Sequence, residues 1–137
     1  MDIQKLVDTM GDASRNTRSD YHLTLGGLIE ALEKFSPDVV VVCGDVPTDH
    51  PGDAMSYRGY YSDLAFEPVN TPVTCGELLQ ECKRVAGETL QGYKGGDFLM
   101  GADTPLWIAE YGGSGGRAVV GISASEGRAV LAIKQIE

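Results

Sequence analysis

The sequence has few of the residues on which most catalytic sites are built. Its two histidines, His22 and His50, do not stand at a zinc-ligand spacing such as H-E-x-x-H. It contains no G-x-S-x-G nucleophile motif and no glycine loop that ends in G-K-[ST]. The sequence therefore gives no positive argument for an enzyme, and we predict no catalytic residue and no cofactor.

Long apolar runs and cysteine pairs are also missing. The longest apolar run, "VVVVC" at 39–43, is far too short to span a membrane, and no segment has the pattern of a signal peptide. Three cysteines, Cys43, Cys75 and Cys82, form neither an even set nor a C-x-x-C pair. This usage is typical of thiols that pack as small apolar residues in a reducing compartment. We therefore expect a cytoplasmic protein that contacts no membrane.

Positive charge is scarce in this chain. It has 11 Lys and Arg residues against 20 Asp and Glu residues, a formal net charge of -9 at pH 7. Such a field repels the backbones of DNA and RNA, which argues against a general nucleic-acid binder. It does not exclude a small anionic ligand that a few local arginines hold.

What the chain does contain predicts one α+β domain over residues 1–137, with an N-terminal helix and loop extension at 1–20. Helices are expected after two threonine caps, Thr24 before residues 25–32 and Thr74, with Glu77 as a capping box, before residues 75–86. Strands are expected at 39–43, 58–67, 106–111, 118–123 and 129–136, the last two as a hairpin. We predict a mostly antiparallel sheet with two to three helices packed on one side, and a loop at 45–56.

The second half of the chain groups aromatic, basic and glycine residues, which are the residues that bind planar anions. Nucleobases stack on aromatic or guanidinium faces, and phosphates bind Arg forks, Lys and bare backbone N–H groups. The stacking candidates are Tyr57, Tyr60, Tyr61, Tyr93, Phe98, Trp107 and Tyr111. From these and the cations beside glycines, we select as ligand-binding residues Phe98, Arg117, Arg128, Lys94, Arg58, Tyr61 and Trp107.

The tyrosine cluster also has an ordinary structural interpretation. On a regular strand Leu64 and Phe66 face the core, which would turn Tyr60 inward as well. Tyr61 and Asp63 would then lie on the opposite, accessible face.

The remaining candidates have similar alternatives. Phe98 and Trp107 are more often core residues than stacking platforms, and Arg58 could pair with a nearby carboxylate. Arg117 and Arg128 could be ordinary surface charges beside a hairpin. It is the grouping of all these residues in an acidic chain that favours a pocket for a small anion.

The segment "DVPTDHPGD", residues 45–53, offers oxygen and imidazole ligands from Asp45, Asp49, His50 and Asp53. They could bind a divalent cation, and one alternative function is a metal-dependent hydrolase centred on these residues. A solvated acidic loop is the favoured interpretation, because two prolines and no helical register leave the ligand geometry loose. We therefore assign no metal ligand.

Four segments, "SYRGYYSDLA", "TPVTCGELL", "GYKGGDFLM" and "TPLWIAEYG", resemble the first type of Thoeris anti-defence protein, a family of small phage-encoded proteins. The resemblance covers roughly residues 23–135, and the acidic segment 45–53 and the N-terminal extension have no clear place in it. It implies a protein that is not an enzyme. Such a protein binds nucleotide immune signals, above all glycocyclic ADP-ribose, without cleaving them, and some members also bind cyclic di- and trinucleotides at separate sites.

The resemblance also implies partners and residue roles. Members assemble as dimers or higher oligomers inside the infected bacterial cell, with ligand pockets at subunit interfaces. By position Phe98 would stack on the ligand, and Arg117 and Arg128 would contact cyclic nucleotides. Two rival functions stay open: an acidic protein that occupies a basic host protein or mimics nucleic acid, and the metal-dependent hydrolase.

Overall fold

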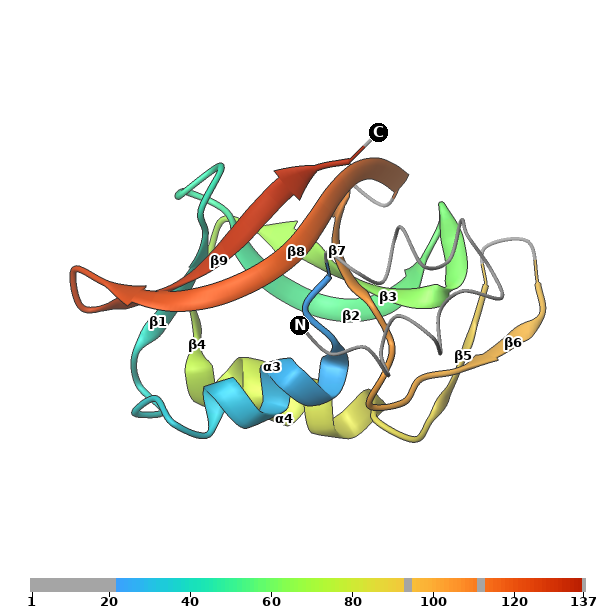
Figure 1. Ribbon diagram of the computed structural model, residues 1–137, viewed down its shortest axis with the longest axis horizontal. Coiled ribbons are helices and arrows are strands. Elements are labelled where there is room, and N and C mark those ends of the chain that lie inside the picture. The colour runs from blue at the N-terminus through green and yellow to red at the C-terminus, as the bar shows by residue number, and fades with distance from the viewer. Residues whose placement is uncertain (1–21, 93–94, 111–112, 137) are drawn as a thin grey trace, which may run out of the picture.

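Two helices and nine strands make up the part of the chain that this computed structural model describes, residues 22–92, 95–110 and 113–136 (Figure 1). The expected helix at 2–10 and loop at 11–20 lie outside these residues. The helices are α3 (Leu25–Leu32) and α4 (Cys75–Val85). The strands are β1 (Val40–Cys43), β2 (His50–Tyr57), β3 (Tyr60–Val69), β4 (Val73–Thr74), β5 (Thr89–Gln91), β6 (Asp97–Leu99), β7 (Leu106–Glu110), β8 (Gly113–Ser125) and β9 (Arg128–Gln135).

Seven of the strands form one mixed sheet in the order β2-β3-β7-β8-β9-β1-β4, and β5 and β6 form a separate antiparallel pair. β3 and β7 run parallel, as do β1 and β9, whereas the other neighbouring strands run antiparallel. The chain is a single-domain α+β protein, as expected. Its sheet is mixed: four of the six neighbouring pairs are antiparallel and two are parallel, so the prediction of a mostly antiparallel sheet is matched in part.

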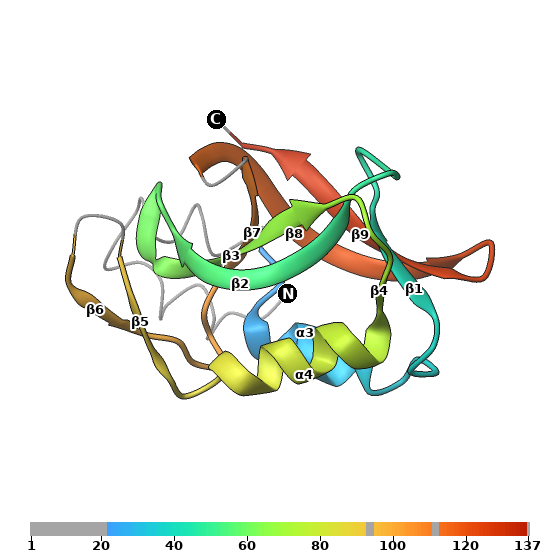
Figure 2. The same ribbon diagram turned by 180° about the vertical axis from the view of Figure 1, so that it is seen from behind.

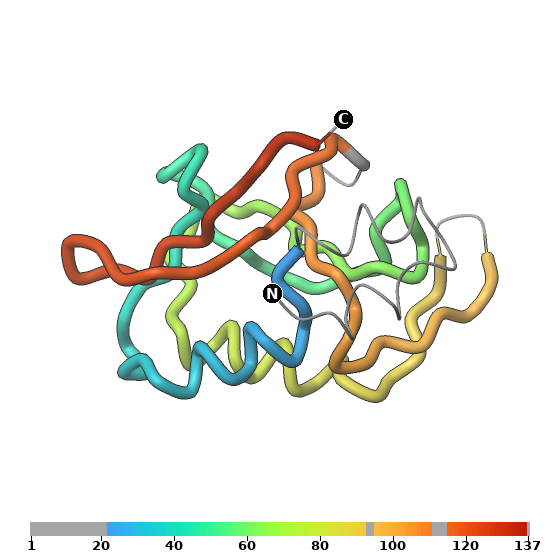
Figure 3. Tube along the Cα trace, viewed as in Figure 1, coloured from blue at the N-terminus to red at the C-terminus, as the bar shows by residue number. Residues whose placement is uncertain are grey.

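The sheet curves so strongly that β2, at one end of the strand order, returns to β1 near the other end. His50 Nδ1 lies 2.7 Å from the carbonyl oxygen of Val41, and the N–H of Cys43 donates to the carbonyl of Asp49 at 3.0 Å. Figures 1 and 2 show β2 and β3 on one side, β8 and β9 on the other, and both helices below them. Figure 3 shows β8 and β9 bending together across the molecule.

Both helices begin where the sequence predicts, because their caps are encoded locally. Thr24 Oγ1 accepts a hydrogen bond from the N–H of Gly27 at 3.1 Å, and Thr74 forms the expected capping box with Glu77. Gly87 follows α4 with a φ of 82°, the left-handed conformation that favours glycine after a helix. No helix in the described residues is long and apolar enough to cross a membrane.

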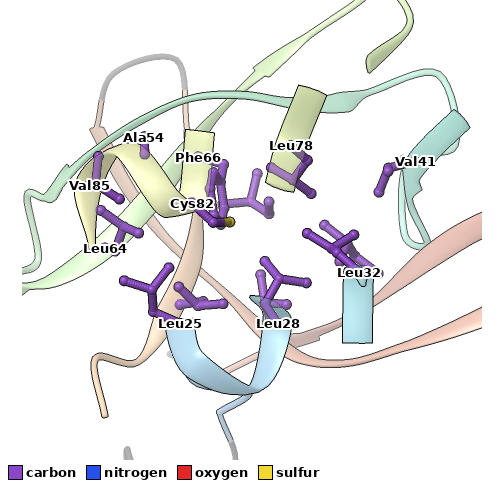
Figure 4. Close-up of a cluster of buried hydrophobic side chains, with 14 of the residues drawn as sticks. Leu25, Leu28, Leu32, Val41, Ala54, Leu64, Phe66, Leu78, Cys82 and Val85 are labelled. Atoms are coloured by element: carbon purple, nitrogen blue, oxygen red, sulfur yellow. The ribbon is translucent and has the colours of Figure 1, made fainter. Parts of the chain in front are cut away.

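One hydrophobic core fills the space between the helices and the sheet (Figure 4). Its members include Leu25, Leu28 and Leu32 from α3, Leu78, Cys82 and Val85 from α4, and Val41, Ala54, Leu64 and Phe66 from the strands. Cys43, Cys75 and Cys82 are buried free thiols in this core, which confirms the prediction that they pack as apolar residues. Burial raises the pKa of Cys43 and of Cys82 to about 12.

The prediction of a loop over residues 45–56 is wrong from His50 onward, where β2 begins. β2 lies at an end of the strand order, so Pro51 can stand in it without removing a central ladder bond. The register shifts between Pro51 and Ala54, which accommodates the turn-forming residues between them. The N–H of Ala54 donates to the Glu81 carboxylate of α4 at 2.7 Å. This backbone donor is therefore satisfied by a side chain and not by a carbonyl of a neighbouring strand.

The strand expected after the tyrosine cluster exists as β3, but its start is irregular. Tyr57 pairs with Tyr60, so a regular ladder would place Ser56 opposite residue 61; Ser56 pairs with Leu64 instead. Three residues of β3 are therefore inserted into the ladder. Side chains alternate between the two faces of a sheet, so an odd number of inserted residues breaks this alternation. The side chains before the insertion then no longer lie on the face that the residues after it would predict.

Candidate functional site

The face of the sheet opposite the main core carries a second cluster, built around Trp107. Its buried members are Tyr57, Ala65, Trp107, Ala109 and Ala118. The indole stacks on the ring of Tyr57 with centroids 4.3 Å apart, and its Nε1 donates to Asp63 Oδ2 at 2.8 Å. Trp107 pairs in the sheet with Ala65 and Ala118, whose small side chains leave room for the two rings. The Trp107 side chain is 0% exposed, so it offers no accessible face for a ligand.

The second cluster and the irregular start of β3 explain two wrong predictions about the tyrosine strand. Asp63, expected to be accessible, is 1% exposed because the face opposite the main core is itself covered. Tyr60, expected to be in the core, is 38% exposed because the irregular start of β3 turns it away from the main core. The ring centroids of Tyr60 and Trp107 are 5.7 Å apart.

We call one end of the molecule the aromatic end; its residues are Arg58 in the β2–β3 turn, Tyr60 and Tyr61 at the start of β3, and Phe98 and Leu99 on β6. The β2–β3 turn and the β5–β6 hairpin lie side by side there, as Figures 1 and 2 both show. Arg58 is exposed in the turn, and Leu99 is 67% exposed on β6. Leu99 follows Phe98 on β6, so the two side chains point to opposite faces of the β5–β6 pair.

Tyr61 and Phe98 are in contact within this end, with ring centroids 5.7 Å apart and planes at 39°. Gly92 allows the contact, because a Cβ there would meet the Phe98 ring at 2.8 Å and the Tyr61 ring at 3.3 Å. Gly95 and Gly96 have φ values of 97° and 87°, conformations that glycine adopts at no steric cost. The glycines of "GYKGGDF" thus build the hairpin that holds Phe98 against Tyr61 of β3.

A hollow of about 240 Å³ adjoins the aromatic end. It is lined by Ser62, Asp63, Leu99, Gly101, Ala102, Asp103, Thr104 and Pro105. Thr104 Oγ1 accepts a hydrogen bond from the N–H of Gly101 at 2.8 Å, which fixes the loop on one side of the hollow. Leu99 gives the hollow an apolar wall, and the exposed carboxylate of Asp103 favours a ligand that presents hydrogen-bond donors.

Arg117, expected to bind phosphate, forms an ion pair in which its own side chain is buried and that of Asp45 is 33% exposed. Its Nε and Nη2 donate to the two carboxylate oxygens of Asp45 at 2.8 and 2.7 Å, and its Nη1 lies 3.8 Å from Asp49 Oδ2. The hydrogen bonds to Asp45 raise the pKa of Arg117 above its ordinary value. A hollow of about 300 Å³ opens beside the pair. An anion could form the same two hydrogen bonds with this guanidinium only by displacing Asp45.

The other cations predicted to bind phosphate are not placed beside Arg117. Arg128 stands opposite Ser125 at the tip of the β8–β9 hairpin, and its Nη2 lies 3.7 Å from Glu126 Oε1. Arg117 stands opposite Gln135 at the other end of the same ladder, so the two arginines are roughly 25 Å apart. Lys94, Tyr93 and Tyr111 lie outside the described residues.

The acidic segment 45–53 does not come together as a cation site. Asp45 and Asp49 face the guanidinium described above, the His50 ring contacts a backbone carbonyl of β1, and Asp53 is exposed on β2. Within the described ranges, no group of three or more His, Cys, Asp or Glu side chains is placed to hold a metal ion.

Of the seven predicted ligand residues, the structure brings Arg58, Tyr61 and Phe98 to one end of the molecule. Sequence reasoning missed Leu99, because no local pattern marks a leucine that stays exposed. It also missed Gly92, although two aromatic residues flanking a glycine-rich stretch are a signal of close packing there. Comparison with protein-family models, curated proteins and solved structures finds no match to this chain.

Proposed function

We propose that the protein binds and sequesters a nucleotide immune signal of the glycocyclic ADP-ribose or cyclic oligonucleotide kind, without cleaving it. The observation that supports this most is the aromatic end, where Tyr61 and Phe98 form one aromatic surface with Arg58 in the adjoining turn. The resemblance of four segments to phage anti-defence proteins supports the same ligand class. It also supports a site of action in the cytoplasm of an infected bacterium.

The magnitudes indicate that one subunit does not complete the site. Depleting a scarce signal needs nanomolar affinity, or about -12 kcal/mol. Stacking contributes about 1–3 kcal/mol per base, and a hollow of about 240 Å³ is smaller than the roughly 300–1,000 Å³ of typical ligand pockets. The rest of an ADP-ribose-type ligand would lie over Arg58 and be covered by a second copy of the chain. The proposal therefore includes a homo-oligomer.

The two hairpin arginines, Arg117 and Arg128, are not part of the ligand site proposed at the aromatic end. Arg117 and Arg128 are too far from each other and from the aromatic pair, along the sheet, to contact one small ligand. Any cyclic nucleotide that they bind would occupy separate sites. At Arg117 its phosphate would have to replace the Asp45 carboxylate.

Calorimetry with glycocyclic ADP-ribose and a panel of cyclic di- and trinucleotides tests the ligand class. We expect Phe98→Leu to weaken binding at least tenfold, because leucine keeps the apolar packing of a half-buried position but removes the aromatic face. Phe66→Leu is the matched control, since Phe66 is 0% exposed in the main core and should change stability without changing affinity.

Absence of any heat at micromolar ligand, from a protein shown to be folded, would contradict the proposal. Equal affinity of wild type and Phe98→Leu would contradict the placement of the site. Mass spectrometry of the small molecule released from the boiled, purified protein identifies the natural ligand independently of the panel.

A second function, occupation of a basic host protein, is favoured by a different surface. A hollow of about 280 Å³ between β2 and α4 is lined by Pro51, Gly52, Asp53, Pro72, Val73, Glu77, Leu78 and Glu81. Its three carboxylates and apolar walls suit a lysine or arginine side chain from another protein. A stoichiometric protein partner recovered from host lysate, with no nucleotide released on heating, would favour this function over sequestration.

A further inference from the structure

The outer part of β8 is a strand edge with no partner among the described residues. β8 pairs with β7 as far as Ala118, and the N–H of Leu23 then donates to the carbonyl of Val119. From Gly121 to Ser125, β8 pairs only with β9 within the described part of the chain. The hairpin tip projects beyond the rest of the molecule in Figures 1 and 2.

The turn at this tip fixes the hydrogen-bonding pattern of the hairpin. Glu126 and Gly127 have φ values of 54° and 78°, as in a two-residue type I′ turn. Such a turn makes Ser125 and Arg128 a hydrogen-bonded pair. Hydrogen-bonded and non-hydrogen-bonded pairs then alternate away from the tip.

This alternation points the N–H and C=O groups of Ile122 and Ala124 away from β9 and toward the open edge. The position of Leu131, which stands opposite Ile122, supports the assignment. Its carbonyl accepts from the N–H of Gly44 on the far side of β9, so it is not used between β8 and β9. The edge therefore offers two donors and two acceptors, two residues apart.

Nothing in the sequence of this edge protects it from pairing. Natural edge strands carry lysine, proline or inward-pointing charges that block a second strand. Residues 118–125, "AVVGISAS", contain no ionisable residue and no proline, in a chain with a net charge of -9. The charges of Glu126 and Arg128 at the tip are opposite in sign and lie 3.7 Å apart. Two acidic copies can therefore approach each other here without bringing like charges together.

We infer that this edge pairs with the same edge of a second copy, antiparallel, about a two-fold axis at Ser123. In that register Ile122 of one copy stands opposite Ala124 of the other, and each such pair exchanges both backbone hydrogen bonds. The two sheets become one continuous sheet across the axis. A copy of the chain fits best because an antiparallel self-pair matches every outward donor with an outward acceptor at the same spacing. This interface does not depend on the proposed ligand.

The two-fold register allows a charge-complementation test at Ser123, whose side chain is exposed. Self-pairing places this residue directly opposite its own copy, where like charges destabilise a strand pair and opposite charges stabilise it. By sedimentation without ligand, we expect wild type at twice the chain mass of 14.6 kDa. Ser123→Lys and Ser123→Glu should each sediment as monomers, and an equimolar mixture of the two should restore the dimer.

Two further variants separate pairing from folding. Ala132→Lys adds the same charge at an exposed position of β9, away from the open edge, and should leave the dimer intact. Ala124→Pro removes an outward N–H and should give a folded monomer, checked by its far-UV spectrum and thermal melt. A monomeric wild type, a dimer unchanged in Ser123→Lys, or a mixture that stays monomeric would each overturn the inferred interface. Ligand calorimetry on the same variants shows separately whether the proposed binding function stands.

Discussion

Arg117 and Asp45 lie 72 positions apart in the chain, yet their side chains form an ion pair with two hydrogen bonds. Each looks functional when the sequence is read alone, the arginine as a phosphate ligand and the aspartate as a possible metal ligand. Trp107 and Asp63 are a similar case, joined by one hydrogen bond in the second cluster. A single sequence shows that such residues need partners, but it does not show that they are each other's partners.

The Arg117 pair can be tested by a double-mutant cycle. Arg117→Met leaves Asp45 and Asp49 facing each other, so we expect a loss of about 2 kcal/mol in the free energy of unfolding. Combining it with Asp45→Asn should give a coupling energy of about 1–2 kcal/mol in urea denaturation.

Arg128→Met is the control for this cycle. Its ion pair with Glu126 is longer and exposed, so the loss should stay within about 0.5 kcal/mol. Equal losses for Arg117→Met and Arg128→Met would show that the Asp45 pair contributes nothing beyond an ordinary surface charge.

At the scale of elements, the two helices share a feature that the sequence shows and the structure explains. Each has a threonine cap followed two positions later by a glycine, Gly26 in α3 and Gly76 in α4. A Cβ at Gly26 would lie 3.0 Å from the Cβ of Ala102, and one at Gly76 would lie 3.0 Å from the Cβ of Pro37. Both helix starts therefore pack closely against a loop, which gives the two helices the same reason to carry a glycine at this position.

The strands were predictable to a lesser degree than the helices. β1, β7 and the β8–β9 hairpin follow from local patterns of apolar residues and turn residues. β2 does not, because Pro51, Gly52 and Asp53 are turn-forming residues that only an edge position and a register shift accommodate. The aromatic end depends on that same irregular strand pair, so its geometry was beyond sequence reasoning although three of its residues were selected.

Glu81 connects these elements, and its contribution should depend on pH. It accepts from Ala54 of β2 and from Arg84, and the hydrogen bond from Arg84 lowers the pKa of Glu81 below its ordinary value of 4.5. A lowered pKa in the folded state means stability that is present above pH 4.5 and is lost as the pH falls through the folded-state pKa. We expect Glu81→Gln to cost about 1 kcal/mol at pH 7 and much less at pH 3.

Urea midpoints at pH 7 and pH 3 measure this difference. Glu30→Gln, on an exposed position of α3, is the control and should change neither midpoint appreciably. A Glu81→Gln deficit that is the same at both pH values would show that the carboxylate charge has no part in holding β2 against α4.

For the molecule as a whole, strand order was the least predictable property. The parallel pairs join β3 to β7 and β1 to β9, and each pair brings together residues separated by tens of positions. Local patterns specify that a segment is a strand, whereas its neighbours depend on how the helices and the curved sheet fill one core. That core takes residues from both helices and from strands at both ends of the sheet order, which makes the described residues one packing unit.

The reactivity of the three buried thiols shows whether the main core unfolds in one step. Cys43 lies on β1, and Cys75 and Cys82 lie on α4, all within the main core. We expect a thiol reagent at pH 8 to modify none of them in native protein and all three in one transition as urea unfolds the chain. The reaction of one thiol at a lower urea concentration than the others would show that β1 or α4 opens separately.

The parallel contact between β1 and β9 has a consequence for how the protein is made. On the side of β1 away from β4, Val41, Val42 and Cys43 pair with Ala129, Val130 and Leu131. A ribosome that has released α3 and β1 must therefore translate most of the remaining chain before this side of β1 has a partner, although β4, on its other side, is made much earlier. During this interval the valine-rich segment is exposed to the cell, so a nascent chain stalled before residue 129 should be a chaperone client.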